Sequence, residues 1–212
     1  FKSWLQKEFP KNTINIKTFK MMYFPITNSQ YNFYIREFIP NLPIPESIRL
    51  KEGSTHPVWG ITFKQATLYA NTLEKYLTKT SRCSYIKVSI PTEYEWEYAA
   101  RGIINNEYPY GNYFDCNKSN TIESGIFSTT PVDNYYKSRS PMGIFDMAGN
   151  VEEWTSSIYQ PYPGGEYIED DLGKKNKIYN VLKGGCFRLG GDLSRCARRH
   201  GLNLSRSPIV GF

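Results

Sequence analysis

The chain carries the same helix-start pattern three times, and this pattern constrains its fold more than any other local feature. A Thr is followed three residues later by Gln or Glu at positions 27–30, 62–65 and 92–95. The Thr hydroxyl and the Gln or Glu side chain can bond reciprocally to the backbone N–H groups that a helix start leaves free. We therefore expect one helix to begin at each of these positions.

Hydrophobic spacing behind the first two starts predicts two long core helices. Apolar residues, many of them Tyr, recur there at intervals of three and four residues, which places them on one face of each helix. The first set ends before Pro40, and the second continues to Leu77. The third helix is expected to be short, from Glu93 to about Arg101, with Gly102 as its C-terminal cap.

The second half of the chain is rich in Gly, Asn, Pro, Ser and Tyr, and only short runs such as 130–132 and 179–182 resemble strands. With 212 residues, 40% of them hydrophobic and 16% aromatic, the chain can bury a sizeable core. Buried aromatics, a bound cation or tight Gly turns are the usual means of fixing so much loop. We expect one α+β domain.

Several strings of residues also fall in a recognisable order along the chain. The most specific is Pro-Thr-Glu-Tyr-Glu-Trp-Glu-Tyr-Ala-Ala-Arg-Gly at 91–102, and the others lie at 25–31, 56–63, 108–111, 143–154, 182–185 and 211–212. Together they resemble the formylglycine-generating enzymes, also called sulfatase-modifying factors. The resemblance runs from about residue 17 to the end, so residues 1–16 are expected to be an N-terminal extension of a single domain, 1–212. It implies a C-type-lectin-like fold with two main helices, small antiparallel sheets and much irregular loop.

The resemblance also implies where an oxidase of this family would keep its catalytic thiols. The family enzyme holds copper with two Cys residues shortly after a Gly-Gly-Ser turn, because soft thiolates bind Cu(I). Here Cys186 replaces the Ser, neither expected position carries Cys, and the next Cys is Cys196. The family's disulfide partner of Cys196 would fall at Ala100, and Ile209 replaces an Asn near the C-terminus. We expect no catalytic Cys pair and no catalytic copper, although a divergent copper-dependent oxidase that uses Cys186 stays open as an alternative.

The same C-terminal stretch resembles the variable region of receptor proteins that diversity-generating retroelements diversify. In those proteins fixed positions hold the backbone while exposed positions contact the ligand. The resemblance places these residues on the exposed ligand surface: Arg188, Leu189, Gly190, Asp192, Arg199, His200, Gly201, Leu202, Leu204, Ser207, Pro208 and Ile209. It implies a non-catalytic domain that recognises a protein or a glycan. An ordinary irregular loop, or an inert interaction module of a larger effector, are the alternatives.

Charge adds an expectation about the partner. Arg188, Arg199 and His200 would favour an acidic patch on it. The net charge of +6 is spread over interleaved Lys and Glu, and no aromatic residues alternate with the basic ones near the C-terminus, so no nucleic acid is expected. No apolar run is long enough for a transmembrane segment, and no secretory signal precedes Phe1. A location at the cell surface or outside the cytoplasm is favoured.

The string 149–154, Gly-Asn-Val-Glu-Glu-Trp, suggests a cation site. The family places a calcium ion at this turn, and the resemblance assigns Asn150, the carbonyl of Val151 and Glu153 as its ligands. Oxygen ligands on a loop suit such a hard cation, which would fix the loop-rich half. The alternative is a turn in which Asn150 and Glu153 bond only the backbone. Glu152 stands where the family usually has Trp, and the family's other calcium site has Gly125 in place of an Asp.

Overall fold

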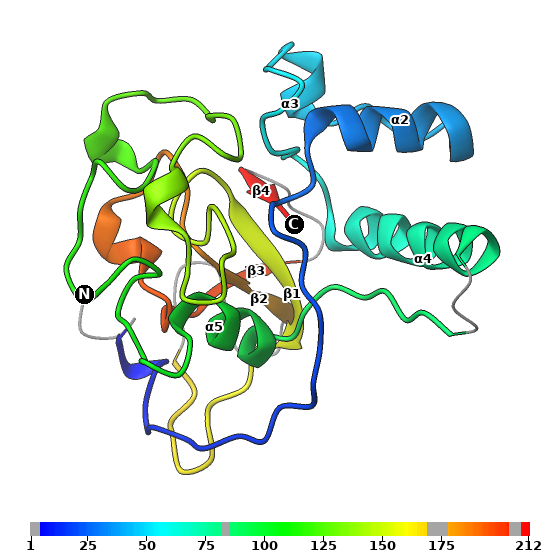
Figure 1. Cartoon of the computed structure of the whole chain (residues 1–212). Coiled ribbons are helices and arrows are strands. Elements are labelled where there is room, and N and C mark those ends of the chain that lie inside the picture. Colours follow the sequence, from blue (N-terminus) through cyan, green and yellow to red (C-terminus); the bar gives the residue numbers. More distant parts are fainter. Residues whose placement is uncertain (1–4, 82–84, 169–177, 204–208) are drawn as a thin grey trace.

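The computed structural model describes residues 5–81, 85–168, 178–203 and 209–212. Helices α2 (Asn28–Phe38), α3 (Glu46–Arg49) and α4 (Phe63–Thr80) lie together on one side of the domain. The short helix α5 (Glu93–Arg101) packs against a small sheet on the other side (Figure 1). The loops contain the short 3₁₀ helices η1 (Ile122–Ser124), η2 (Tyr136–Ser138) and η3 (Gly191–Ser194).

The three helix starts confirm the capping-box prediction. In each, the Thr hydroxyl accepts a hydrogen bond from the backbone N–H three residues on, and the Gln or Glu side chain accepts one from the Thr N–H. The second of these bonds measures 2.9 Å at Thr27, 2.7 Å at Thr62 and 2.7 Å at Thr92. Gly102 ends α5 with φ of 61°, where its N–H donates to the Tyr98 carbonyl.

The sheet contains β1 (Glu152–Ile158), β2 (Tyr179–Lys183), β3 (His200–Asn203) and β4 (Val210–Gly211), in the order β3-β2-β1-β4. The β1–β2 and β2–β3 pairs are antiparallel, whereas β1 and β4 are parallel. The sheet is therefore mixed rather than purely antiparallel, because the closing Gly211 returns beside the start of β1. The run 130–132 is not a strand, since the side chain of Asn150 bonds the backbone N–H and carbonyl of Thr130.

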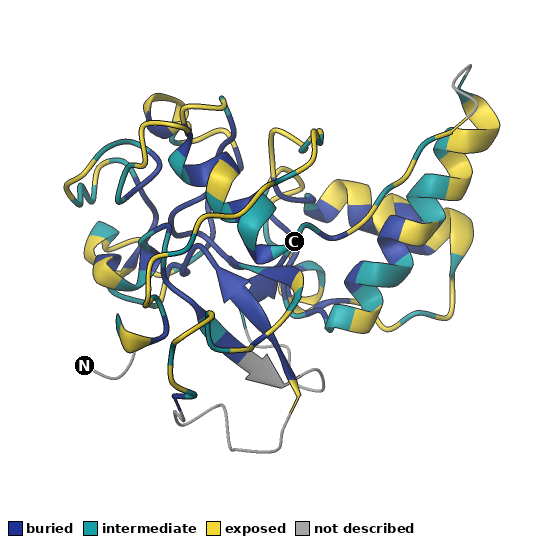
Figure 2. Ribbon diagram, turned by 90° about the horizontal axis from the view of Figure 1, so that it is seen from below, coloured by how far each residue is buried: buried dark blue, intermediate teal, exposed yellow. Residues whose placement is uncertain are grey.

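The core joins the helices to the sheet. Tyr31 of α2 stacks on Tyr69 of α4 with ring centroids 5.7 Å apart, and the C-terminal Phe212 packs edge-on against both rings. Trp154 of β1 belongs to the same cluster and is fully buried. Figure 2 shows buried residues along the strands and exposed ones on the outer faces of the helices and loops. In the described part of the chain, no helix is long and apolar enough to cross a bilayer.

Candidate functional site

A tight turn at Gly184 and Gly185 leads from β2 into the C-terminal segment, defined here as residues 184–203. Their φ values are 92° and 70°, a region that favours glycine. A Cβ at Gly184 would lie 3.3 Å from the Trp96 ring, and one at Gly185 would lie 3.0 Å from the Leu193 carbonyl. The segment therefore starts beside Trp96 of α5, and its first two positions require glycine.

The two cysteines of this segment are buried free thiols. Burial and the neighbouring Glu152 carboxylate raise the pKa of Cys186 to about 12. Burial also raises the pKa of Cys196, which packs in one apolar cluster with Ala100 and Trp96. Cys196 thus lies in the same cluster as the residue that replaces its expected disulfide partner. Both surroundings disfavour the thiolate, the form that binds a metal.

Arg199 and Glu93 form a buried bidentate ion pair between the C-terminal segment and α5. Their nitrogen–oxygen distances are 2.7 and 2.9 Å, and the two side chains are 1% and 2% exposed. Arg199 also donates to the carbonyls of Lys7 and Gln160, and its guanidinium lies 4.0 Å from the centroid of the Tyr162 ring. Such a guanidinium holds the fold together and is not free to bind a partner.

Glu152 of β1 holds two further basic side chains of the segment. One of its carboxylate oxygens accepts a 2.7 Å bond from Arg198, and His200 Nδ1 lies 2.8 and 3.0 Å from the two oxygens. Burial alone would raise the pKa of Glu152, but His200 and Arg198 outweigh it and lower the pKa to about 2. Glu152, at the position where the family usually has Trp, thus supplies the negative charge that compensates Arg198.

The N-terminal residues are tied to the same segment. Glu8 forms a bidentate pair with Arg195, with both distances at 2.7 Å, and Arg195 also bonds Glu107 at 3.2 Å. The Lys7 ammonium lies 5.0 Å from the centroid of the Tyr159 ring. Two residues of the expected extension, Lys7 and Glu8, therefore contact the C-terminal segment.

Lys183, the last residue of β2, is a buried cation behind the segment. Its ammonium donates to Glu97 of α5 at 2.9 Å and to the carbonyls of Cys196 and Arg198 at 2.8 and 3.1 Å. Burial alone would raise the pKa of Glu97, but Lys183 and Arg101 outweigh it and lower that pKa. The inner side of the segment is therefore held by charge pairs as well as by apolar packing.

The outer side carries part of the expected ligand surface. Arg188 and Asp192 are exposed, and the half-buried positions are Leu189, Gly190, His200 and Ile209. These six positions are accessible to a partner, at least in part. Leu204, Ser207 and Pro208 lie outside the described residues, and the side chain of Leu202 is not described.

Two of the expected surface positions are buried, so the expectation of exposure is wrong for them. Arg199 points inward because Glu93 compensates its charge. Gly201 faces the ring of Tyr179, which a Cβ at this position would overlap. Gly201 lies within β3 and pairs with Val181 of β2, and Arg199 lies directly before this strand.

The turn before β1 is organised by the buried side chain of Asn150. Its oxygen accepts hydrogen bonds from the Thr130 N–H at 3.0 Å and from the Asn120 amide at 3.3 Å. Its amide nitrogen donates to the Thr130 carbonyl at 3.0 Å and to the Asp146 carboxyl at 2.8 Å. Asn150 therefore uses all the hydrogen-bonding capacity of its side chain and joins the parts of the chain that carry Asn120, Thr130 and Asp146. The alternative of a turn bonded only to the backbone holds for the bonds to Thr130, whereas the other bonds go to the side chains of Asn120 and Asp146.

Two carboxyl groups lie near this amide, that of the buried Asp146 and that of the half-buried Glu153. Burial raises the pKa of Glu153 to about 7, although the Trp96 indole donates to it at 2.7 Å. Burial also raises the pKa of Asp146 well above its usual value, and the nearby Glu153 adds to that rise. In the described residues neither carboxyl pairs with a Lys or Arg, and no three His, Cys, Asp or Glu side chains gather as a metal site. The local charge fits a cation, but amide or carbonyl oxygens would have to complete its ligands.

The chain matches the model of the sulfatase-modifying factor enzyme 1-like domain over residues 2–212. The chain belongs to this family. The recognition of formylglycine-generating enzymes from the strings of residues is confirmed, and so is the α+β fold of their C-type-lectin-like type.

The relatives of this sulfatase-modifying-factor-like domain differ in what their names say. The serine/threonine-protein kinase Pkn1 of Chlamydia trachomatis is 33% identical over 91% of this chain but only 32% of its own length. The inactive Cα-formylglycine-generating enzyme 2 of mouse is 27% identical over 73% of this chain and 63% of its own. Proteins named simply formylglycine-generating enzyme are relatives as well. Treponema denticola variable protein 1 shares the fold, with a TM-score of 0.67, 20% identity, and coverage of 89% of this chain and 80% of its own.

Sequence reasoning missed several residues that build the site. The strings of residues do not connect Asp146 or Trp96 with the Asn150 turn, and the resemblance assigns Glu8 to an N-terminal extension. Asp146 had one usable signal, since it lies four residues before Asn150 inside the string 143–154. Glu8 had none, because its partner Arg195 is 187 residues away.

Proposed function

We propose that this domain is a non-catalytic recognition module that presents the outer side of its C-terminal segment to a protein or glycan. The observation that carries the proposal is the contrast between the two sides of the segment. Arg195, Arg198 and Arg199 are held by carboxylates on the inner side, while Arg188 and Asp192 are exposed. A backbone fixed before binding loses little entropy when a partner binds, which is the physical basis of a rigid paratope.

The state of the thiols argues against the alternative of a copper-dependent oxidase. A Cu(I) site needs thiolates, and burial raises the pKa of Cys186 and of Cys196. The variable-protein fold and the relative named inactive support the same choice.

A matched pair of charge-swapped variants tests the recognition surface. The first exchanges the exposed charges of the segment, with Arg188→Glu and Asp192→Lys; the control exchanges those of α2, with Arg36→Glu and Glu37→Lys. A glycan array and a phage-displayed peptide library would be probed with each. We expect wild-type binders to weaken at least about tenfold with the first variant and to be retained by the control. Binders that are indifferent to the first exchange would place recognition elsewhere.

A copper titration tests the oxidase alternative directly. Reduced wild type, Cys186→Ala and Cys196→Ala would compete for Cu(I) with a chelator, beside a variant without any Cys. We expect wild type to bind no more tightly than the Cys-free variant. Tight binding that is abolished by Cys186→Ala and also by Cys196→Ala would mean that two thiolates share one metal. That result would favour the oxidase.

The kinase relatives support a second candidate, an interaction module of a larger effector. This chain covers 91% of its own length but only 32% of the Chlamydia trachomatis kinase. In that case the segment would contact another part of the same polypeptide rather than a separate ligand. Crosslinking of the full-length protein would distinguish the two, since an internal partner gives crosslinks from residues 188–192 within one polypeptide.

We also propose that a structural calcium ion binds at the Asn150 turn. Glu153, the Val151 carbonyl and the side-chain oxygen of Asn150 would hold it, with Asp146 as an added carboxylate, and the Asn150 oxygen would give up a hydrogen bond. The ion would replace the repulsion between the Asp146 and Glu153 carboxylates with attraction.

Thermal unfolding after chelation tests this proposal. We expect added calcium to raise Tm by several degrees at neutral pH, more than magnesium does, and Glu153→Gln to abolish the rise while Glu37→Gln keeps it. An unchanged Tm of the wild type at millimolar calcium would contradict the site.

A further inference from the structure

Two segments far apart in sequence form a second surface on the body of the domain. The rings of Phe24 and Phe145 lie 4.6 Å apart between centroids, and the Tyr136 ring lies 6.0 Å from that of Phe145. The Phe145 N–H donates to the Tyr23 carbonyl at 2.9 Å, which fixes the two segments side by side. Tyr23 and Tyr136 are 65% and 60% exposed, so the ring cluster reaches the solvent.

Arg139 rests on this cluster. Its guanidinium carbon lies 4.2 Å from the centroid of the Tyr136 ring and 5.6 Å from that of Phe145. Within the described chain neither Arg139 nor the nearby Lys137 forms an ion pair, and the Asp133 carboxylate in the same loop pairs with neither. A guanidinium that lies over a ring and forms no ion pair keeps its N–H groups available to a partner.

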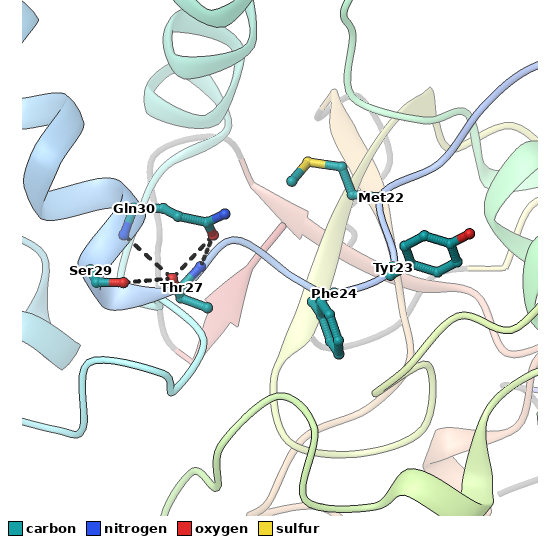
Figure 3. A pocket seen from close by; sticks show the side chains of 6 residues that line it. All are labelled: Met22, Tyr23, Phe24, Thr27, Ser29 and Gln30. Atoms are coloured by element: carbon teal, nitrogen blue, oxygen red, sulfur yellow. Dashed lines mark hydrogen bonds between the residues drawn. The ribbon is translucent and has the colours of Figure 1, made fainter.

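Two hollows are lined by residues of this cluster and its neighbours. One, of about 480 Å³, is lined by Tyr136, Lys137, Arg139, Ser140, Pro141 and Gly143. The other, of about 400 Å³, is lined by Met22, Tyr23, Phe24, Thr27, Ser29 and Gln30. Figure 3 shows Met22, Tyr23 and Phe24 on one side of the second hollow and the polar side chains of the α2 start on the other. Those polar side chains bond one another in the capping box, which leaves the apolar side to meet a ligand.

We propose that this aromatic-cationic surface, made of the exposed residues Tyr23, Phe24, Tyr136 and Arg139 over the buried ring of Phe145, binds an acidic peptide segment of a partner protein. A carboxylate of the peptide would pair with Arg139, since a guanidinium fork matches carboxylate geometry, and Lys137 would attract a second one. An apolar side chain beside it would pack on Met22 and Phe24, because thioether and ring surfaces adapt to varied apolar groups. Charge complementarity is the reason for proposing an acidic partner. Arg139 and Lys137 form no ion pairs within the described chain, and they lie beside exposed aromatic rings.

Fluorescence anisotropy with a defined probe tests the proposal. The probe is a labelled hexapeptide that alternates Asp with Phe or Leu, and its counterpart carries Asn in place of each Asp. We expect wild type to bind the Asp probe at least about tenfold more tightly than the Asn probe. Arg139→Ala should weaken binding of the Asp probe about tenfold, and Arg139→Lys should restore part of it, because lysine keeps the charge but loses the planar fork.

Controls separate this surface from the C-terminal one. Arg36→Ala, on the exposed side of α2, should leave the probe's affinity unchanged within about twofold, and Tyr23→Ala should weaken it without affecting folding. A loss of affinity in Arg188→Ala, on the C-terminal segment, would place the probe on that segment and overturn the proposal. Equal binding of the two probes, or of wild type and Arg139→Ala, would overturn the proposal. Tighter binding of a uronic-acid disaccharide than of the peptide would replace it with an acidic glycan site.

Discussion

The C-terminal segment and the loop around Arg139 both carry arginines, and the two regions use them in opposite ways. Arg199 is 1% exposed at its side chain and is paired to Glu93 through two bonds. Arg139 is exposed, rests on two rings and has no ion pair in the described chain. A positive residue in the sequence thus gives little information about binding until its partner is known. Paired arginines fix the fold, and unpaired ones remain available to a partner.

The largest expected effect comes from removing the partner of Arg199. Glu93→Ala leaves a buried guanidinium without its carboxylate, and we expect the free energy of unfolding to fall by about 3–5 kcal/mol. Urea denaturation followed by circular dichroism measures it. Asp192→Ala, which removes an exposed carboxylate of the same segment, is the matched control and should change the value by less than about 0.5 kcal/mol.

A double variant sharpens this prediction. Glu93→Met combined with Arg199→Met removes both charges, so it should recover most of the stability that Glu93→Ala loses. If Glu93→Ala proved as stable as Asp192→Ala, the distinction between the buried and the exposed charges of the segment would fail.

A smaller loss is expected when the N-terminal pair is broken. Glu8→Gln keeps the shape of the side chain but loses the charge that accepts two 2.7 Å bonds from Arg195. We expect a loss of about 1–2 kcal/mol in the free energy of unfolding, since Arg195 remains partly solvated and keeps Glu107. Faster proteolysis near residues 8–10 should accompany it. Unchanged stability would mean that the N-terminal residues do not brace the C-terminal segment.

Acid should weaken the same inner side gradually. The pKa of Glu97 is lowered on folding, because Lys183 and Arg101 outweigh the effect of burial. The stability it contributes is therefore present above the ordinary glutamate pKa and is lost as pH falls through the lower, folded pKa. Urea midpoints between pH 7 and pH 3 should fall more steeply for wild type than for Glu97→Gln. Parallel pH profiles would contradict this role.

The parts of the fold that the sequence predicted are those decided by neighbouring residues. Capping boxes span four residues, and Gly102 acts as a cap where a helix ends, so local chemistry was sufficient. The charge pairs could not be predicted in this way, because Glu93 and Arg199 lie 106 residues apart and no residue close to Arg199 in the sequence indicates its partner. The same reason explains why Arg199 was expected on the surface. The ring cluster under Arg139 likewise joins residues 24 and 145, and it became visible only in three dimensions.

The smallest expected effect concerns the unpaired arginine. Arg139→Ala removes contacts with two rings at an exposed site, so the free energy of unfolding should fall by less than about 1 kcal/mol. Arg188→Ala provides the comparison, since its guanidinium also lies near a ring, at 5.4 Å from the Phe187 centroid. Both substitutions should therefore leave the urea midpoint nearly unchanged, in contrast with Glu93→Ala. A loss of about 3 kcal/mol at Arg139 would mean that it braces the fold as Arg199 does. The contrast between the two regions would then fail, because Arg139 would be needed for the fold and would no longer be available to bind a partner.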